Sequence, residues 1–383
     1  MNLQHYFNPV DFEAYSKDIT YNWKYSLGAT IEKCTTRFRE GNEKNIELAI
    51  VGVPFVTNEN ISLYSDATNL IRKELYQLAA QGKVNLIDFG NLKESSSNKG
   101  NYLALRDVVD YLNEMNIVTL ILGGSQDFSY GVCQAFRNNK FFSYSTIDAF
   151  LDVKKGKETF SQANYLSRIF SSQPTIFEFN LLGHQSHYIP TEYFAKVKGV
   201  NNHLRLGQLR DNIGLAEPVF RNTDFLSFDF VALKHSDAPG ASNQPNGLRN
   251  EEACQLAKYA GLSTRLKVFG LMGMQSEIEK CPISVGIAAQ IIWYFIEGHS
   301  NRSALKPEGK EGFSVNKVDI AELDAPLKFY QNIETNQWWM EIQAINNEII
   351  YLACLEKDYF DACSNEIPTI WLKYIQKIDE ILK

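Results

Sequence analysis

Three aspartates follow buried, strand-like runs of the sequence. Asp148 comes directly after residues 142–147, Asp152 stands four residues later, and Asp229 follows the apolar run 225–228. Carboxylates that converge repel one another unless a cation or a proton lies between them. A hard divalent cation held by oxygen ligands is one way to bring them together. The alternative is that each aspartate caps a helix or a turn.

Two glycine-containing segments also follow strand-like runs. The turn Gly123-Gly124-Ser125-Gln126 comes after residues 117–122, and a loop over residues 238–248 comes after the third aspartate. A glycine pair by itself is weak evidence, because it can serve only the turn. In a parallel α/β sheet, however, ligands bind outside the carboxyl ends of the strands. The residues in these turns are therefore expected at the same edge of the sheet as the aspartates.

The elements that must position these residues alternate along the chain. Continuous apolar runs predict strands buried on both faces, and the helix-like segments between them predict right-handed crossovers in a parallel sheet. The predicted strands are residues 48–53, 84–89, 117–122, 142–147, 175–179, 225–228 and 267–271. The predicted helices are residues 66–80, 102–115, 251–260 and 284–297, with another that begins near Ser129. The sequence therefore predicts an α/β fold.

The pattern changes after about residue 300. Residues 302–312 are polar and contain Pro307, which indicates a linker, and residues 338–342 and 348–352 flank Asn346-Asn347 as in a hairpin. A helix is expected from Pro368 onward. We divide the chain into an N-terminal extension (1–45), an α/β domain (46–300) and a linker with a C-terminal extension (301–383). This extension is expected to pack on the α/β domain; the alternative is that its aromatic residues form a partner or oligomer interface.

Composition excludes several classes of protein. The 383 residues carry 38 Lys and Arg against 45 Asp and Glu, for a net charge of -7, and no polybasic run, so nucleic acid is not an expected partner. The chain shows neither a secretory signal nor an apolar run of about 18 residues that could span a membrane. Its six cysteines are scattered without a CxxC pair. These features predict a soluble, cytoplasmic protein with reduced thiols.

In their order along the chain, these segments resemble the ureohydrolases, the family of arginase, agmatinase and formimidoylglutamase. The family patterns are a Gly-Gly-x-His turn, an Asp-Ala-His-x-Asp turn, and a Ser-x-Asp-x-Asp segment that leads to a Pro-Gly loop. The match runs from about residue 47 to residue 297, and the loop 238–248 is most similar to the formimidoylglutamase branch. The resemblance implies one doubly wound, mostly parallel sheet between two helical layers, and a homo-oligomer.

The resemblance also implies a metal site with substituted ligands. Family members hold two manganese ions on either side of a bridging hydroxide, and Asp148 and Asp229 match the carboxylates that both ions share. Gln126 replaces one histidine ligand, whereas Phe150 and Val231 replace the two ligands that belong to the second ion alone. None of the six histidines stands at a metal position. We predict that the second ion is absent.

The first ion keeps an all-oxygen set of ligands. The three aspartates and the amide oxygen of Gln126 suit a single Mn, Mg or Ca ion. The alternative is a site without metal, in which Gln126 donates hydrogen bonds to the carboxylates. Ser242 and Asn243 in the Pro-Gly loop, together with Gln275 near the position of the family's amidine-binding acid, are expected to contact a small amidine or amino-acid-like ligand.

These substitutions predict a protein that has lost the dinuclear chemistry and uses the scaffold for binding, regulation or assembly. No residue is assigned as catalytic. The rival prediction is a metal-dependent hydrolase that uses one ion to cleave C–N bonds in linear amidines of the formimidoylglutamate, agmatine or arginine type. A third is a scaffold that pairs with an active homologue through its C-terminal extension.

Overall fold

The computed structural model describes most of the chain. The described residues are 1, 3–10, 23–33, 45–58, 61–82, 84–153, 159–172, 176–196, 200–241, 243–274, 276–303, 305–344 and 346–382. Three sheets organise them: a ten-stranded sheet, a four-stranded sheet near the C-terminus, and a two-stranded hairpin.

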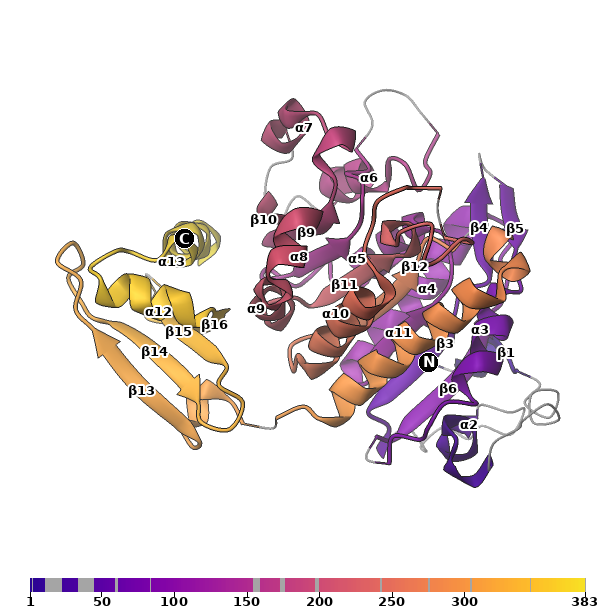
Figure 1. Cartoon of the computed structure of the whole chain (residues 1–383), viewed down its shortest axis with the longest axis horizontal. Coiled ribbons are helices and arrows are strands. Elements are labelled where there is room, and N and C mark those ends of the chain that lie inside the picture. Colours follow the sequence, from indigo (N-terminus) through magenta and orange to yellow (C-terminus); the bar gives the residue numbers. More distant parts are fainter. Residues whose placement is uncertain are drawn as a thin grey trace.

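The ten-stranded sheet forms the centre of the larger part of the molecule (Figure 1). Its order is β1-β6-β3-β7-β12-β11-β8-β9-β10, with β2 also paired to β6. Only the pairing of β1 with β6 is antiparallel among the strands described. The strands are β1 (Phe7–Asn8), β2 (Glu32–Lys33), β3 (Leu48–Gly52), β6 (Leu86–Leu92), β7 (Val118–Leu122), β8 (Ser143–Ile147), β9 (Glu178–His184), β10 (Val200–Arg205), β11 (Phe225–Asp229) and β12 (Val268–Met272).

Helices cover both faces of this sheet. One apolar core lies between the sheet and α3, α9, α10 and α11, and another lies between the opposite face and α4, α5 and α6. The helices of this part are α2 (Leu27–Thr30), α3 (Ala67–Leu75), α4 (Asn98–Glu114), α5 (Ser129–Ala135), α6 (Tyr165–Ser172), α7 (Thr191–Lys196), α8 (Leu206–Asp211), α9 (Ala216–Arg221), α10 (Asn250–Leu262) and α11 (Pro282–Ser300). The predicted three-layer, mostly parallel α/β fold is confirmed.

Short 3-10 helices connect several of these elements. They are η1 (Leu3–His5), η2 (Trp23–Tyr25), η4 (Gln126–Phe128), η5 (Ser186–Tyr188), η6 (Ile213–Leu215), η7 (Phe230–Ala232), η8 (Ser276–Lys280) and η9 (Pro307–Gly309). A separate antiparallel hairpin is formed by β4 (Phe55–Asn58) and β5 (Ile61–Tyr64).

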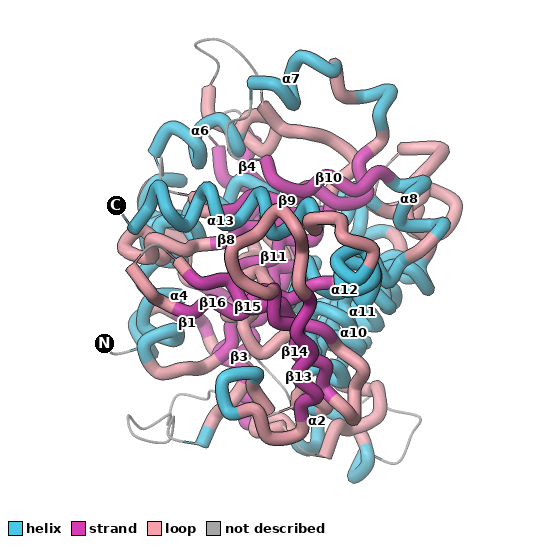
Figure 2. The backbone as a smooth tube through the Cα atoms, turned by 90° about the vertical axis from the view of Figure 1, so that its left-hand side faces the viewer, coloured by secondary structure: helices cyan, strands magenta, loops and turns pink. Residues whose placement is uncertain are grey.

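The C-terminal part is a small α+β unit. Its antiparallel sheet has the order β13-β14-β15-β16, and α12 and α13 share its apolar core (Figures 1 and 2). The elements are β13 (Phe313–Val318), β14 (Leu327–Asn332), β15 (Trp338–Gln343), β16 (Ile349–Cys354), α12 (Glu356–Cys363) and α13 (Thr369–Leu382). The expected hairpin is the β15–β16 pair and the expected helix is α13, whereas β13, β14 and α12 were not predicted.

Hydrogen bonds join this unit to the α/β part. The Asn222 side chain donates to Ala353 O at 2.9 Å and accepts from Ala353 N at 2.9 Å, which extends the edge of β16. The guanidinium of Arg221 donates to Trp338 O at 3.0 Å, and Lys377 Nζ donates to Phe177 O at 2.6 Å. Three elements of the unit are thus tied to the α/β part: β15 and β16 to the end of α9, and α13 to the segment just before β9.

Two further features are the apolar character of the helices and the state of the cysteines. Among the described residues, no helix has the length and apolar character required to cross a membrane. The five cysteines that the structure describes are free thiols, and Cys34 lies outside those residues.

Candidate cation site and ligand pocket

The three aspartates converge at the carboxyl ends of two neighbouring strands. In the parallel pair β8–β11, Phe228 stands beside Ile147, so the residues that follow them, Asp229 and Asp148, meet at one edge of the sheet. Asp152 reaches the same point from the loop after β8. Each aspartate offers a carboxylate oxygen within 4.8 Å of the other two. The structure therefore brings together the three carboxylates that the sequence singled out.

Backbone groups fix two of these carboxylates. The amide of Phe150 donates to Asp148 Oδ1 at 2.9 Å, and the amide of Val231 donates to Asp229 Oδ1 at 2.8 Å. Gly273, at the end of β12, has φ of +75°, and a Cβ there would lie 1.9 Å from Asp229 Oδ1. Only glycine both adopts this backbone conformation easily and leaves room for the carboxylate.

Burial and mutual repulsion disfavour the ionised cluster. Burial, and after it the charge of Asp152, raises the pKa of Asp148 well above its usual value. Burial, and after it the charge of Asp148, raises the pKa of Asp229 in the same way. At least two buried carboxyl groups therefore have, among the described residues, no basic side chain beside them that would stabilise their ionised form. A bound cation would supply that compensation.

Gln126 has a buried amide group that is oriented by hydroxyls on the neighbouring elements. Its side chain is fully buried, and Nε2 donates to the hydroxyls of Ser227 at 2.9 Å, Tyr165 at 3.1 Å and Thr146 at 3.2 Å. Its Oε1 is buried without a hydrogen-bond partner among the described residues. The acceptors of the amide N–H groups are hydroxyls, so the alternative in which Gln126 donates to the carboxylates finds no support. An amide oriented by three hydroxyls has an oxygen left over for a hard cation.

At the two positions where the resemblance implies ligands of a second ion, the side chains are apolar. Phe150 and Val231 line the pocket next to the aspartates, and the Phe150 ring stacks on Tyr188 with 4.7 Å between centroids. A second ion would be bound only by the two carboxylates that it shares with the first ion, because Phe150 and Val231 offer no ligand atom. It would lose bound water without gaining protein ligands in its place, so these residues do not fit a dinuclear centre.

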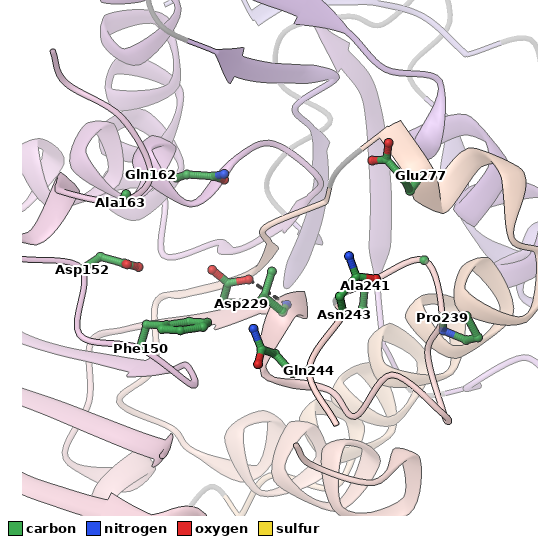
Figure 3. Close-up of a pocket in the computed structure, with 12 residues that line it drawn as sticks. Phe150, Asp152, Gln162, Ala163, Asp229, Pro239, Ala241, Asn243, Gln244 and Glu277 are labelled. Atoms are coloured by element: carbon green, nitrogen blue, oxygen red, sulfur yellow. Dashed lines mark hydrogen bonds between the residues drawn. The ribbon is translucent and has the colours of Figure 1, made fainter. Parts of the chain in front are cut away.

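A pocket of about 480 Å³ opens above the aspartates (Figure 3). Asp152 and Asp229 lie on one side, and Glu277 of η8 lies across from them. No Lys, Arg or His is among the described residues that line it. The described residues that line it are Phe150, Asp152, Gln162, Ala163, Asp229, Val231, Pro239, Gly240, Ala241, Asn243, Gln244 and Glu277. The pocket is therefore acidic, with polar amides at its rim.

The predicted ligand-binding residues have different outcomes. Asn243 lines the pocket, whereas Ser242 and Gln275 lie outside the described residues. Sequence reasoning missed Glu277, which stands two residues after the position where an acid was sought, and it missed Tyr165 beneath Gln126. Glu277 lies in the short η8 turn, which has no apolar periodicity from which its position could be predicted. Tyr165 lies far in the sequence from every motif.

Most of the chain is similar in sequence to a known family. The model of the Arginase family matches residues 46–297. The chain belongs to the arginase family. A search of curated protein sequences finds no match. The match covers the strands and loops that carry the aspartates, which agrees with the resemblance inferred from the motifs.

Solved structures show the same fold. The Trypanosoma cruzi formiminoglutamase with Mn²⁺ has 18% sequence identity and a TM-score of 0.63, covering 73% of this chain and 99% of that one. The formimidoylglutamase of Bacillus subtilis has 20% identity and a TM-score of 0.62, covering 75% and 96%. The agmatine ureohydrolase of Thermoplasma volcanium has 16% identity and a TM-score of 0.56, covering 68% and 92%.

Proposed function

We propose that this arginase-family protein binds one hard divalent cation and a small cationic ligand, and that it has lost the two-metal hydrolysis of the family. The observation that carries the proposal is the set of three converging carboxylates with an unpartnered amide oxygen nearby, next to two apolar side chains at the second metal position. Four oxygen donors suit Mn, Mg or Ca better than zinc. When bound, such an ion would neutralise the aspartates and polarise an oxygen of a ligand or water.

The lining of the pocket indicates the class of ligand. Glu277 faces the aspartates across the cavity, and Asn243 and Gln244 add amide groups that can donate and accept. An amine, amidine or amino-acid-like molecule would pair its positive group with Glu277 and place a polar group near the cation. A purely anionic ligand would meet three carboxylates without a basic side chain to offset them.

Two features support the loss of hydrolysis. The described lining residues include no histidine that could act as a general base. A second metal ion, whose positive charge would help to form a hydroxide nucleophile, also lacks ligands at the positions of Phe150 and Val231. A general base alone contributes about 10²–10⁴ in rate, and the second ion contributes further. A binding or regulatory role fits these residues better than turnover does.

The proposal is tested by titrating the purified chain with Mn²⁺ after removal of metals, and by repeating the titration with arginine, agmatine and formimidoylglutamate. We expect one Mn²⁺ per chain and saturable binding of at least one of these molecules. Asp148→Asn and Asp229→Asn should both lose the ion, whereas Asp110→Asn, a matched change on the exposed face of α4, should keep it. Two ions per chain, or none, would contradict the proposal.

A single-ion hydrolase is the second candidate, because Asp152 and Asp229 line the pocket directly and a water on the cation would face the ligand. Its signature is release of urea, ammonia or formamide from the same three compounds. Activity that exceeds the Asp148→Asn control and requires added metal would replace the binding role with this one.

A further inference from the structure

A second cavity, of about 420 Å³, lies at the same edge of the sheet beyond the candidate cation site. It opens where β9 ends at His184 and β10 ends at Arg205. Tyr188, which follows His187 of this cavity, stacks on Phe150 and donates a hydrogen bond to Gln244 Oε1, two residues that line the acidic pocket. The two cavities are neighbours with different linings.

His184 is the unusual residue of this cavity. It lines the cavity, its side chain is buried with 2% of the residue exposed, and neither ring nitrogen has a hydrogen-bond partner among the described residues. Buried polar atoms in native proteins are nearly always paired, and leaving them unpaired destabilises the fold. A ligand in the cavity that His184 lines would supply a partner for the ring nitrogen nearest to it.

The neighbours of this ring are aromatic side chains, with the cationic Arg205 close enough to affect its pKa. Its centroid lies 5.9 Å from the ring of His203 and 5.1 Å from that of Phe194. Burial, and after it the charges of His203 and Arg205, lowers the pKa of His184 to about 4. Arg205 is exposed at the cavity, and Asp211 is the only carboxylate among the described residues that line it.

A metal ion is a poor fit here. Within the described part of the chain, the only group of three or more His, Cys, Asp or Glu residues with convergent ligand atoms is the aspartate cluster. His184 and His203 therefore lack a third ligand, which transition metals in proteins usually require. An anion fits better, because it accepts hydrogen bonds from an imidazole N–H and from a guanidinium and offsets the positive charge of Arg205.

We propose that this cavity binds a small oxyanion, a carboxylate or a phosphate, between the imidazole of His184 and the guanidinium of Arg205. The guanidinium presents a planar fork that matches either anion. The exposed His187 adds a donor, and Asp211, the last residue of α8, places a negative charge against the anion. The site does not depend on the cation site, so it survives if that proposal fails.

The experiment uses the full chain with ¹⁵N-labelled histidine. Its imidazole resonances are followed during titration with inorganic phosphate in one arm and succinate in the other, each against NaCl at equal ionic strength. The His184 signal is the one missing from a His184→Asn spectrum. We expect it to shift saturably in at least one arm, and the arm that responds identifies the source of the oxyanion.

Two substitutions test the role of charge. The residues that they change, Arg205 and Asp211, are exposed, so the variants should fold. Arg205→Gln should raise the dissociation constant about tenfold through loss of a charge-assisted pair, and Asp211→Asn should lower it about threefold by removing repulsion. Arg137→Gln, a matched change at an exposed position elsewhere, should leave it unchanged. No saturable shift in either arm, equal affinity in Arg205→Gln, or a shift with Zn²⁺ alone would overturn the proposal.

Discussion

Replacement of Asp148 by asparagine should stabilise the metal-free protein while abolishing its response to metal. The carboxyl groups of Asp148, Asp152 and Asp229 have oxygens within 4.8 Å of one another, and the first is only 1% exposed. Without a cation these groups repel, so the native state is destabilised by the residues that are needed to bind the ion. An asparagine amide removes one charge and can donate to the remaining carboxylates.

The geometry sets the magnitude. Two unit charges 4.8 Å apart repel by about 3 kcal/mol at an effective dielectric constant of about 20. Proton uptake by the cluster relieves part of this, so we expect Asp148→Asn to raise the free energy of unfolding in EDTA by about 1–3 kcal/mol. Saturating metal acts on the wild type in the same direction, by about 2.7 kcal/mol at 100 times the dissociation constant.

Thermal unfolding at pH 7, in EDTA and in excess Mn²⁺, measures both effects. The wild type should melt higher with Mn²⁺ than with EDTA. Asp148→Asn should melt higher than the wild type in EDTA and show no change with Mn²⁺, and Asp110→Asn should match the wild type in both conditions. If Asp148→Asn lowers the melting temperature in EDTA, the carboxylate serves as a structural cap and the reasoning is refuted.

Three further outcomes are expected. Arg221→Ala should lower the free energy of unfolding by about 3 kcal/mol, because it removes a buried guanidinium that ties β15 to α9. It should also increase proteolytic cleavage at residues 301–312, and unchanged cleavage would contradict this. Burial, and after it Arg302, lowers the pKa of His299 to about 3, against about 6.5 when unfolded, so its contribution to stability is present above pH 6.5 and is lost as the pH falls. His299→Gln should therefore reduce the slope of stability against pH by about 1.4 kcal/mol per unit between about pH 6 and 4; an unchanged slope argues against a buried neutral ring. Phe150→His combined with Val231→Asp should raise bound Mn²⁺ from one to two per chain by elemental analysis, and a count that stays at one means the second position is closed for another reason.

The sequence predicted the architecture well where apolar periodicity is strong. The predicted strands at residues 48–53, 117–122 and 225–228 correspond to β3, β7 and β11, because both faces of these strands are buried. The predicted strand at residues 175–179 was placed early. In the structure β9 runs from Glu178 to His184 with polar residues such as Asn180, which pair with polar residues on neighbouring strands.

Other elements carried too little signal. The edge strand β10 (Val200–Arg205) contains three polar residues in its centre, which reads as a loop. In β13 (Phe313–Val318), only Phe313 is buried, and the other positions alternate between half-buried and exposed beside its partner β14. Packing across the C-terminal sheet determines these strands, and local sequence does not reveal it.

The candidate site was predicted in part. The motif order located the aspartates and the substituted positions, because each follows a strand. The hydrogen-bond partners of Gln126 come from three separate elements, and the second cavity at His184 depends on the loop after β11 meeting the end of β9. Such contacts are set by the tertiary fold. Homo-oligomer formation, cytoplasmic location and pairing with another protein stay predictions.

The most direct test is the metal content of the full chain after incubation with excess Mn²⁺ and extensive dialysis. One ion per chain, lost in both Asp148→Asn and Asp229→Asn and kept in Asp110→Asn, is the predicted result. Two ions per chain would mean that Phe150 and Val231 do not close the second position, and no ion in the wild type would mean that the converging carboxylates share protons and do not bind metal.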